Sequence, residues 1–358
     1  MSTTSNWRLL CDGIRDPSLH LAVEEAVLRG VNDGSSLPTL RLRQSNRSVW
    51  IGVYQVPEED VDLEFCTKWK IPVIRRQNPG GAVYQDEGSF CYSLFFPKEE
   101  LFSRLGLHDS MDLYPLMGRA VAATCGEYGV EALTSPVNDV TIRGRKVYGS
   151  AQVEFYNAFV HSGSFLVSTD LEAMQRALMP SALKFADKGF TTVKERVINL
   201  SEAVGRCIPV EEVMDRLAAQ IARALAIDLA PAPLLPAEQE LAEELNREKY
   251  SRKEWTFRNQ PAFTTVLATK ARSGVITLEA RMDGGVIAEA RVRGDFLLPD
   301  QNEMGRVLER MAQQPLEAAR QLVQSSALPE DLKDGLERLL GELQWSSAFA
   351  VGNHVTGY

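Results

Sequence analysis

The sequence predicts an α+β protein in two parts of unequal length. Segments that alternate like strands and segments with helical spacing follow one another without a strict βαβ rhythm, which favours the α+β class over a doubly wound sheet. A proline-rich stretch at 230–236 then interrupts the chain. Proline fixes φ and lacks an N–H, so this stretch ends the preceding helix and stiffens the chain that follows.

Residues 1–230 form the expected first domain. Pro17-Ser18 precedes apolar residues at helical spacing and predicts the start of a helix, and further helices are expected at 111–128 and 210–227. The segments that predict strands alternate in polarity or are rich in β-branched and aromatic residues: 39–43, 48–54, 71–74, 90–96 and, as two short strands, 154–167.

Residues 231–261 are interpreted as a linker with an acidic helical segment, and 262–345 as a small α+β domain. A strand at 262–268 opens this domain. Two alternating segments then flank Asp283-Gly284-Gly285, a turn sequence typical of a β-hairpin. Helices are expected at 304–311, 315–323 and 332–343. The tail at 346–358 contains no Asp, Glu, Lys or Arg, and the sequence offers no role for it.

Composition excludes several classes of function. The 358 residues are 44% apolar and 24% charged, as in ordinary globular proteins, and no stretch of 18 apolar residues predicts a membrane span. The N-terminus lacks the pattern of a signal peptide, so a cytoplasmic protein is expected. A net charge of −9 disfavours general binding to nucleic acid or anionic membranes. Five scattered cysteines without a CxxC pair indicate reduced thiols, not disulfides or a zinc site.

Two arginines and a Pro-Gly-Gly turn follow a predicted strand. Guanidinium groups suit carboxylates and phosphates, and glycines let a ligand approach the backbone closely. Taken alone, the same pattern also fits a simple surface turn. The segment reads Arg75-Arg76-Gln77-Asn78-Pro79-Gly80-Gly81-Ala82-Val83-Tyr84.

A second segment pairs an acid and an amide with a basic turn. Asp139 offers oxygen ligands for Mg²⁺, and Lys146 offers a charge that could neutralise a phosphate or carboxylate. A solvated β-turn with basic tips is the alternative. The segment contains Asn138-Asp139, then Arg143-Gly144-Arg145-Lys146-Val147-Tyr148-Gly149-Ser150-Ala151-Gln152.

Two further segments, His161 to Leu166 and Lys188 to Leu200, are weaker signals, because a lone histidine is more often structural than catalytic. The sequence contains neither a Walker P-loop nor a GxSxG elbow. A site for ATP would therefore be of another type.

In this order, the four segments resemble the lipoate–protein ligase A family, as do the opening Trp7-Arg8-Leu9-Leu10 and Leu21-Ala22-Val23-Glu24-Glu25. The resemblance covers about 7–345. It implies an α+β fold in which a biotin/lipoyl-ligase-like mixed-sheet catalytic domain is followed by a small α+β C-terminal accessory domain.

The resemblance also implies a reaction in two steps. Lipoate and MgATP give lipoyl-adenylate and pyrophosphate, and a lysine of an apo carrier protein then attacks the adenylate. ATP and Mg²⁺ would be co-substrates, with no tightly bound prosthetic group. Lys146 would be catalytic, because one fixed cation can serve charge that builds first on the α-phosphate and then on the carbonyl oxygen. The implied ligand-binding residues are Arg76, Asn78, Gly80, Gly81, Ala82, Val83, Tyr84, Asn138, Asp139, Gly149, Ser150, Ala151 and His161.

Two departures from the family pattern concern the glycine turn. Asn78-Pro79 stands where the family has serine and glycine, and Gln85 stands where it has histidine. These changes could narrow substrate preference or mark a different carrier. The expected partners are lipoate, or octanoate, and a lipoyl domain, a glycine-cleavage H-like protein or another lipoate carrier. A monomer is expected.

Three other functions compete with the ligase. An octanoyl or lipoyl transferase would need a nucleophilic cysteine near Lys146, but the sequence has no cysteine between Cys125 and Cys207, and Cys91 lies in a predicted buried strand. A biotin ligase would carry a different glycine-rich motif. A non-catalytic lipoate-binding relative is disfavoured because Lys146 and Asn138-Asp139 are present.

Overall fold

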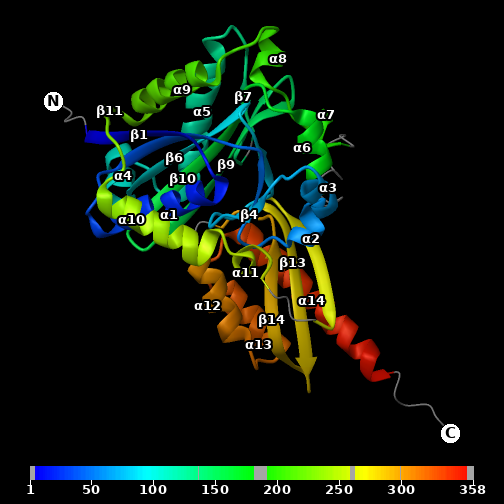
Figure 1. The fold of residues 1–358 in the computed structure, drawn as a ribbon. Coiled ribbons are helices and arrows are strands. Elements are labelled where there is room, and N and C mark those ends of the chain that lie inside the picture. Colours follow the sequence, from blue (N-terminus) through cyan, green and yellow to red (C-terminus); the bar gives the residue numbers. More distant parts are fainter. Residues whose placement is uncertain (1–4, 136, 181–191, 259–262, 299, 353–358) are drawn as a thin grey trace.

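The computed structural model describes residues 5–135, 137–180, 192–258, 263–298 and 300–352. An eight-stranded mixed sheet with helices on both faces forms the larger part, and a three-stranded sheet with three helices forms the smaller part beside it (Figure 1). The predicted α+β class is confirmed.

The large sheet has the strand order β11-β1-β2-β6-β10-β9-β8-β7. Its first three strands run parallel to one another, and every other neighbouring pair is antiparallel. The strands are β1 (Ser5–Arg15), β2 (Thr39–Ser45), β6 (Ser89–Pro97), β7 (Leu133–Thr134), β8 (Asp139–Ile142), β9 (Arg145–Phe155), β10 (Ala158–Leu166) and β11 (Ile227–Pro231).

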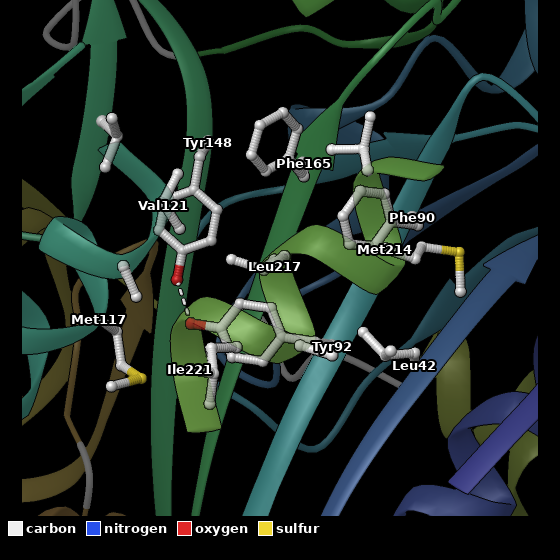
Figure 2. Packing of buried hydrophobic residues seen from close by; sticks show 14 of the residues in the cluster. Leu42, Phe90, Tyr92, Met117, Val121, Tyr148, Phe165, Met214, Leu217 and Ile221 are labelled. Atoms are coloured by element: carbon white, nitrogen blue, oxygen red, sulfur yellow. Dashed lines mark hydrogen bonds between the residues drawn. The ribbon is translucent and has the colours of Figure 1, made fainter. Parts of the chain in front are cut away.

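Side chains on neighbouring positions of the central strands point to opposite faces, and each face has its own hydrophobic core. Phe95 packs with α1 (Pro17–Asp33) and α10 (Pro236–Leu245), whereas Phe96 packs with α5 (Leu113–Gly126), α9 (Val210–Leu225) and α4 (Lys98–Leu105). Figure 2 shows part of the second core, where Phe90 and Phe165 stack with centroids 5.5 Å apart and Tyr92 and Tyr148 share a hydrogen bond of 2.7 Å. The large sheet is thus the middle of three layers.

A second, small sheet carries the glycine turn. Its order is β4-β3-β5, and the turn at 79–81 lies between β4 and β5. The elements in and around it are β3 (Ser48–Ile51), β4 (Val73–Arg75), β5 (Val83–Gln85), α2 (Pro57–Asp60), α3 (Leu63–Lys68), α6 (Leu171–Ala177) and α7 (Val193–Arg196). The short helix α8 (Leu200–Val204) packs in the core on the α5 side of the large sheet. The 3₁₀ turn η1 (Ser110–Asp112) precedes α5.

The chain after α9 differs from the sequence expectation. The predicted helix ends at Leu225, because Ala226 adopts a left-handed conformation with φ 50°, and residues 227–231 then add the strand β11 beside β1. Residues 236–258 pack on the first part as α10, the π-helical turn η3 (Asn246–Tyr250) and α11 (Lys253–Thr256). These residues therefore form a folded layer, which lies mainly over α1.

The smaller part has its own core of aliphatic residues between a sheet and helices. The predicted hairpin is confirmed as β13 and β14. The last helix continues to Gly352, so residues 346–352 of the predicted tail are helical, and residues 353–358 lie outside the described part. The elements are β12 (Thr265–Ala271), β13 (Gly274–Asp283), β14 (Val286–Gly294), α12 (Gln301–Met311), α13 (Leu316–Gln324) and α14 (Glu330–Gly352). Within the described ranges, no helix combines the length and the apolar character needed to cross a bilayer.

A buried ion pair fixes α10 to the first strand. Arg8 of β1 and Glu238 of α10 are each 4% exposed and lie 2.6 Å apart, and Ser36 also donates to Glu238. Although burial opposes it, these hydrogen bonds hold the pKa of Glu238 below its ordinary value.

Replacing Arg8 by methionine should leave a buried carboxylate without its partner. We expect Arg8→Met to lower the free energy of unfolding by about 3 kcal/mol or more. Arg216→Met is the control, since that side chain is 39% exposed in its ion pair with Glu127 and the substitution should change the free energy of unfolding much less. If chemical denaturation showed the same loss in free energy of unfolding for both variants, the stabilising role of the buried Arg8–Glu238 pair would be contradicted.

Candidate active site

A cavity of about 560 Å³ lies between the large sheet, the small sheet and the smaller part of the protein. This volume is in the usual range for small-molecule sites. The cavity brings together every predicted site residue except His161. These lining residues are Arg76, Asn78, Gly80, Gly81, Ala82, Val83, Tyr84, Asn138, Asp139, Lys146, Gly149, Ser150 and Ala151.

Arg76 organises the glycine turn from within. Its guanidinium donates to the carbonyls of Trp50 at 2.7 Å, Pro79 at 3.0 Å and Gly81 at 2.8 Å. Burial lowers the pKa of Arg76 to about 10. Gly80 has φ 95°, and an added Cβ would lie 3.3 Å from a methyl of Leu297. Arg76 and the positive φ of Gly80 therefore define the shape of the turn around Pro79.

The neighbouring Arg75 points away from the cavity. Its guanidinium donates to the carbonyls of Gly52, Val53 and Gln55 and to those of Trp255 and Thr256, at 2.7–3.1 Å. The indole N–H of Trp255 returns a hydrogen bond of 2.8 Å to the Arg75 carbonyl. The side chains of the two arginines thus point in different directions. Arg76 supports the glycine turn, whereas Arg75 connects α11 to the loop after β3.

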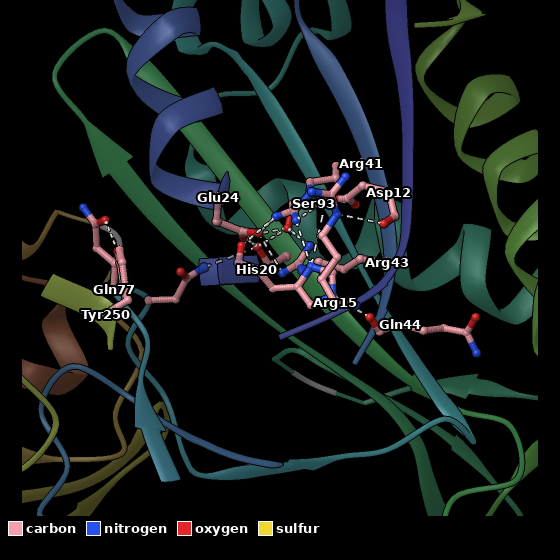
Figure 3. Close-up of polar contacts among 12 residues, drawn as sticks. Asp12, Arg15, His20, Glu24, Arg41, Arg43, Gln44, Gln77, Ser93 and Tyr250 are labelled. Atoms are coloured by element: carbon pink, nitrogen blue, oxygen red, sulfur yellow. Dashed lines mark hydrogen bonds and ion pairs between the residues drawn. The ribbon is translucent and has the colours of Figure 1, made fainter. Parts of the chain in front are cut away.

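A buried polar network forms another wall (Figure 3). Glu24 of α1 accepts from Ser93 at 2.7 Å and Ser162 at 2.8 Å, and pairs with Arg43 of β2 at 2.7 Å. Asn78 donates to Ser162 at 3.3 Å, which connects the glycine turn to this network.

Glu24 and Arg43 line the cavity, yet they were not among the predicted site residues. The sequence did contain a signal for Glu24, because its carboxylate lies on the buried side of an amphipathic helix. An unpaired charge is costly there, so a partner such as Arg43 was to be expected.

Lys146 lies in a charged cluster at the cavity wall. Its ammonium is 2.6 Å from one oxygen of Asp139, and Arg196 is 3.6 Å from the other. Asn138 donates at 2.6 Å to the carbonyl of Ser150, and the backbone N–H of Ser150 donates at 3.0 Å to the carbonyl of Asn138. The strands that carry Asp139 and Lys146 are therefore held in register.

The surroundings of Asp139 do not fit the predicted Mg²⁺ site. Both carboxylate oxygens face cationic side chains. In the described ranges, no group of three or more His, Cys, Asp or Glu side chains is arranged to hold a metal. The contacts of Asp139 therefore serve to position Lys146, and they do not provide a ligand set for a protein-bound Mg²⁺.

Gln85 takes no direct part in the cavity. Its amide donates at 2.8 Å to Ser164 and accepts at 2.9 Å from Ser89, and the side chain is buried. Gln85 therefore links β5 to β10 and β6.

His161 does not belong to the cavity, and its assignment as a ligand-binding residue does not fit this structure. Its side chain lies in the core on the α5 side of β10, 3.1 Å from the amide of Gln152 and beside the rings of Tyr92 and Tyr114. Burial lowers its pKa to about 3. Alternation along β10 explains the error, because Ser162 and Ser164 face the cavity.

Of the fourth sequence segment, residues 188–191 lie outside the described part, whereas Val193, Arg196 and Val197 line the cavity. Cys91 also lines it, but burial raises the pKa of its thiol. The nucleophilic thiolate that the transferase alternative would require is therefore disfavoured at this position.

Comparison with known proteins decides the family. Residues 16–222 match the family model of the lipoyl protein ligase A/B catalytic domain. This chain belongs to that family. The lipoate-protein ligase A subunit 1 of Thermoplasma acidophilum is 31% identical over 257 residues, which cover 69% of this chain and 94% of the relative.

Three solved structures extend the likeness to the fold. The archaeal bi-partite lipoate protein ligase, described with its E2 lipoyl domain from Thermoplasma acidophilum, has a TM-score of 0.63 and 30% identity over 73% of this chain and 100% of that chain. A lipoate-protein ligase A bound with ATP has a TM-score of 0.59 and 30% identity over 70% and 98%. LipL1 of P. falciparum, in complex with lipoate, has a TM-score of 0.73 over 93% and 99%, and at 19% identity it shows the fold alone.

The buried state of His161 should be visible in the pH dependence of stability. Because the pKa rises from about 3 in the folded protein to its ordinary 6.5 on unfolding, the unfolded chain binds an extra proton between these values, and stability falls as the pH falls below 6.5. His161→Gln should reduce this slope by up to about 1.4 kcal/mol per pH unit. The exposed His108, replaced by glutamine in the same way, is the matched control for the substitution itself.

Proposed function

We propose that this chain activates lipoate with ATP and transfers the lipoyl group to a lysine of a carrier protein. The observation that carries the proposal is the convergence of the glycine turn with Lys146 in one cavity, within a chain of the lipoyl protein ligase family. Apolar residues of the same cavity suit an acyl chain. They include Leu21, Trp50, Leu166, Met174, Leu178 and Leu297.

In the first step, a carboxylate oxygen of lipoate attacks the α-phosphorus of ATP, a new P–O bond forms and pyrophosphate leaves. Negative charge increases on the α-phosphate during this attack. The ammonium of Lys146 has three N–H donors, so it can keep its bond to Asp139 and still donate to the ligand. Asp139 thereby fixes the direction in which Lys146 presents its remaining donors.

In the second step, the amine of the carrier lysine attacks the acyl carbonyl of the adenylate. An amide bond forms, the mixed anhydride bond breaks and AMP leaves. Charge now develops on the carbonyl oxygen, which is close to the α-phosphate because a single bridging oxygen joins the acyl carbon to the phosphorus. One lysine at this junction is therefore able to stabilise both transition states.

The glycine turn is proposed to hold the adenylate through its backbone. Gly80 and Gly81 leave space beside the cavity, and Arg76 uses its donors on backbone carbonyls, so it shapes the turn from behind. Asn78 and Tyr84 line the same region. Fixed donors of this kind bind an anion without having to reorganise.

The co-substrate and the carrier complete the proposal. Mg²⁺ would enter with the phosphates of ATP and not through Asp139. Residues 231–261 and 262–345 are proposed as the connection and the accessory domain. The carrier is proposed to be a lipoyl domain or an H-like protein, consistent with the E2 lipoyl domain described with the archaeal relative. The enzyme is proposed to act as a monomer and to accept octanoate as well as lipoate.

Pyrophosphate release from MgATP tests the first step without a carrier. We expect release that depends on lipoate in the wild type, and a loss of roughly 10²–10³-fold in rate for Lys146→Ala. Lys98→Ala is the control variant. Lys98 does not line the cavity, and its ammonium pairs with Glu154 at 2.7 Å. Absence of release with both lipoate and octanoate would overturn the ligase proposal.

Gly149 offers a test that leaves Lys146 in the sequence. An added Cβ would lie 2.2 Å from the Lys146 ammonium nitrogen, so Gly149→Ala must displace that side chain. We expect at least about a tenfold loss in the rate of adenylate formation, because positioned charges lose their effect when moved. Gly126→Ala has open space around its Cβ and should keep full activity. Normal turnover by Gly149→Ala would argue against a positional role of Lys146.

A further inference from the structure

The turn between β12 and β13 reaches across to the catalytic part. It belongs to the smaller part of the chain, yet its residues line the cavity beside the glycine turn and Lys146. These lining residues are Lys270, Ala271, Arg272, Ser273, Gly274 and Val275. The smaller part therefore supplies side chains to the site as well as packing beside it.

This turn is held firmly at its base. The backbone N–H of Ser273 donates at 2.8 Å to Asp331 of α14, and that of Val275 donates at 2.6 Å to Asp295. Gly274 has φ 149°, and an added Cβ would lie 2.5 Å from the Phe296 Cα. Glycine is thus required where the turn packs on the backbone after β14, and the flanking side chains start from a fixed frame.

Two cations project from this frame. Arg272 is exposed, lines the cavity and makes no hydrogen bond or ion pair with any residue in the described ranges. Lys270, two positions earlier on β12, lines the same cavity. The nearby carboxylate of Asp331 accepts the backbone N–H of Ser273 at the base of the turn.

The net charge of the chain is −9, so carboxylates are in excess. Because Arg272 pairs with none of those in the described ranges and lines the cavity wall, its charge indicates an anionic ligand.

The charge of the cavity identifies the class of anion. Lys146 and Arg196 lie with Asp139 on the catalytic wall, and the two cations of the turn add to them from the other part. A lipoate carboxylate carries a single negative charge and needs only one of these groups. The triphosphate of a nucleotide carries about four, and the planar fork of an arginine suits phosphate oxygens.

We propose that Lys270 and Arg272 bind the β- and γ-phosphates of ATP during adenylate formation. This inference rests on the proposed function and names the part of the site that holds the leaving group. The two side chains bind the group that departs as pyrophosphate, whereas the α-phosphate stays with the lipoyl group. Their contacts therefore end when pyrophosphate leaves, and the transfer step proceeds without them.

Equilibrium binding separates this role from turnover. ATP and inorganic pyrophosphate are titrated calorimetrically into the wild type, Arg272→Ala, Lys270→Ala and the double variant. We expect each single change to raise both dissociation constants about tenfold, as for the loss of a charge-assisted hydrogen bond. Arg281→Ala is the control, because Arg281 lies on β13, is 49% exposed and pairs with Glu289 at 3.6 Å outside the cavity.

Kinetics with two starting points complete the test. Starting from ATP, the variants should show a raised KM for ATP; starting from preformed lipoyl-adenylate and an apo lipoyl domain, they should transfer at the wild-type rate. Unchanged binding of ATP and pyrophosphate would overturn the proposal. Loss of transfer with normal pyrophosphate release would also overturn it and would assign the two cations to carrier binding.

The binding experiment also distinguishes this inference from the proposed function. If ATP and pyrophosphate bound in an Arg272-dependent manner without any lipoate-dependent turnover, the ligase proposal would fail while the phosphate site stood. Unchanged melting temperatures of the variants, whose altered side chains line an open cavity, would show that the fold is intact.

Discussion

The buried ion pair between Glu24 and Arg43 holds helix α1, strand β2 and one wall of the cavity together. It joins α1 to β2 at 2.7 Å, while Arg41 of the same strand reaches Asp12 of β1 at 2.6 Å. Although burial opposes it, the charge of Arg41 holds the pKa of Asp12 below its ordinary value. A charge in the interior is tolerated only with such partners, so helix, strands and cavity wall must assemble together.

The cavity is a composite of segments that are far apart in the sequence. Asn78 of the glycine turn reaches Ser162 of β10, and through it the Glu24 network, while Leu297 of the smaller part covers Gly80. Arg75 fastens α11 to the loop after β3. Leu297 therefore brings the smaller part directly against the turn that would hold the adenylate.

Small residues make room for the chemistry at two positions of the sheet. A Cβ on Gly149 would occupy the place of the Lys146 ammonium, and one on Gly163 would lie 2.3 Å from the ring of Tyr148. The neighbouring strands can therefore approach closely while two long side chains cross between them. Glycine at positions 149 and 163 is therefore explained by the space that the side chains of Lys146 and Tyr148 occupy.

The α+β class, the glycine turn and the wall that carries Asn138, Asp139 and Lys146 could be predicted from the sequence, because they depend on local periodicity and on residues close along the chain. Other features of the site depend on packing between distant segments. Whether His161 faces the cavity or the core depends on which face of β10 meets α5, and Arg75 and Arg76 differ only in the direction of their side chains. The contribution of Arg272 required a turn more than a hundred residues from Lys146 to fold back onto the sheet, and long-range packing of this kind leaves no periodic signal in a single sequence.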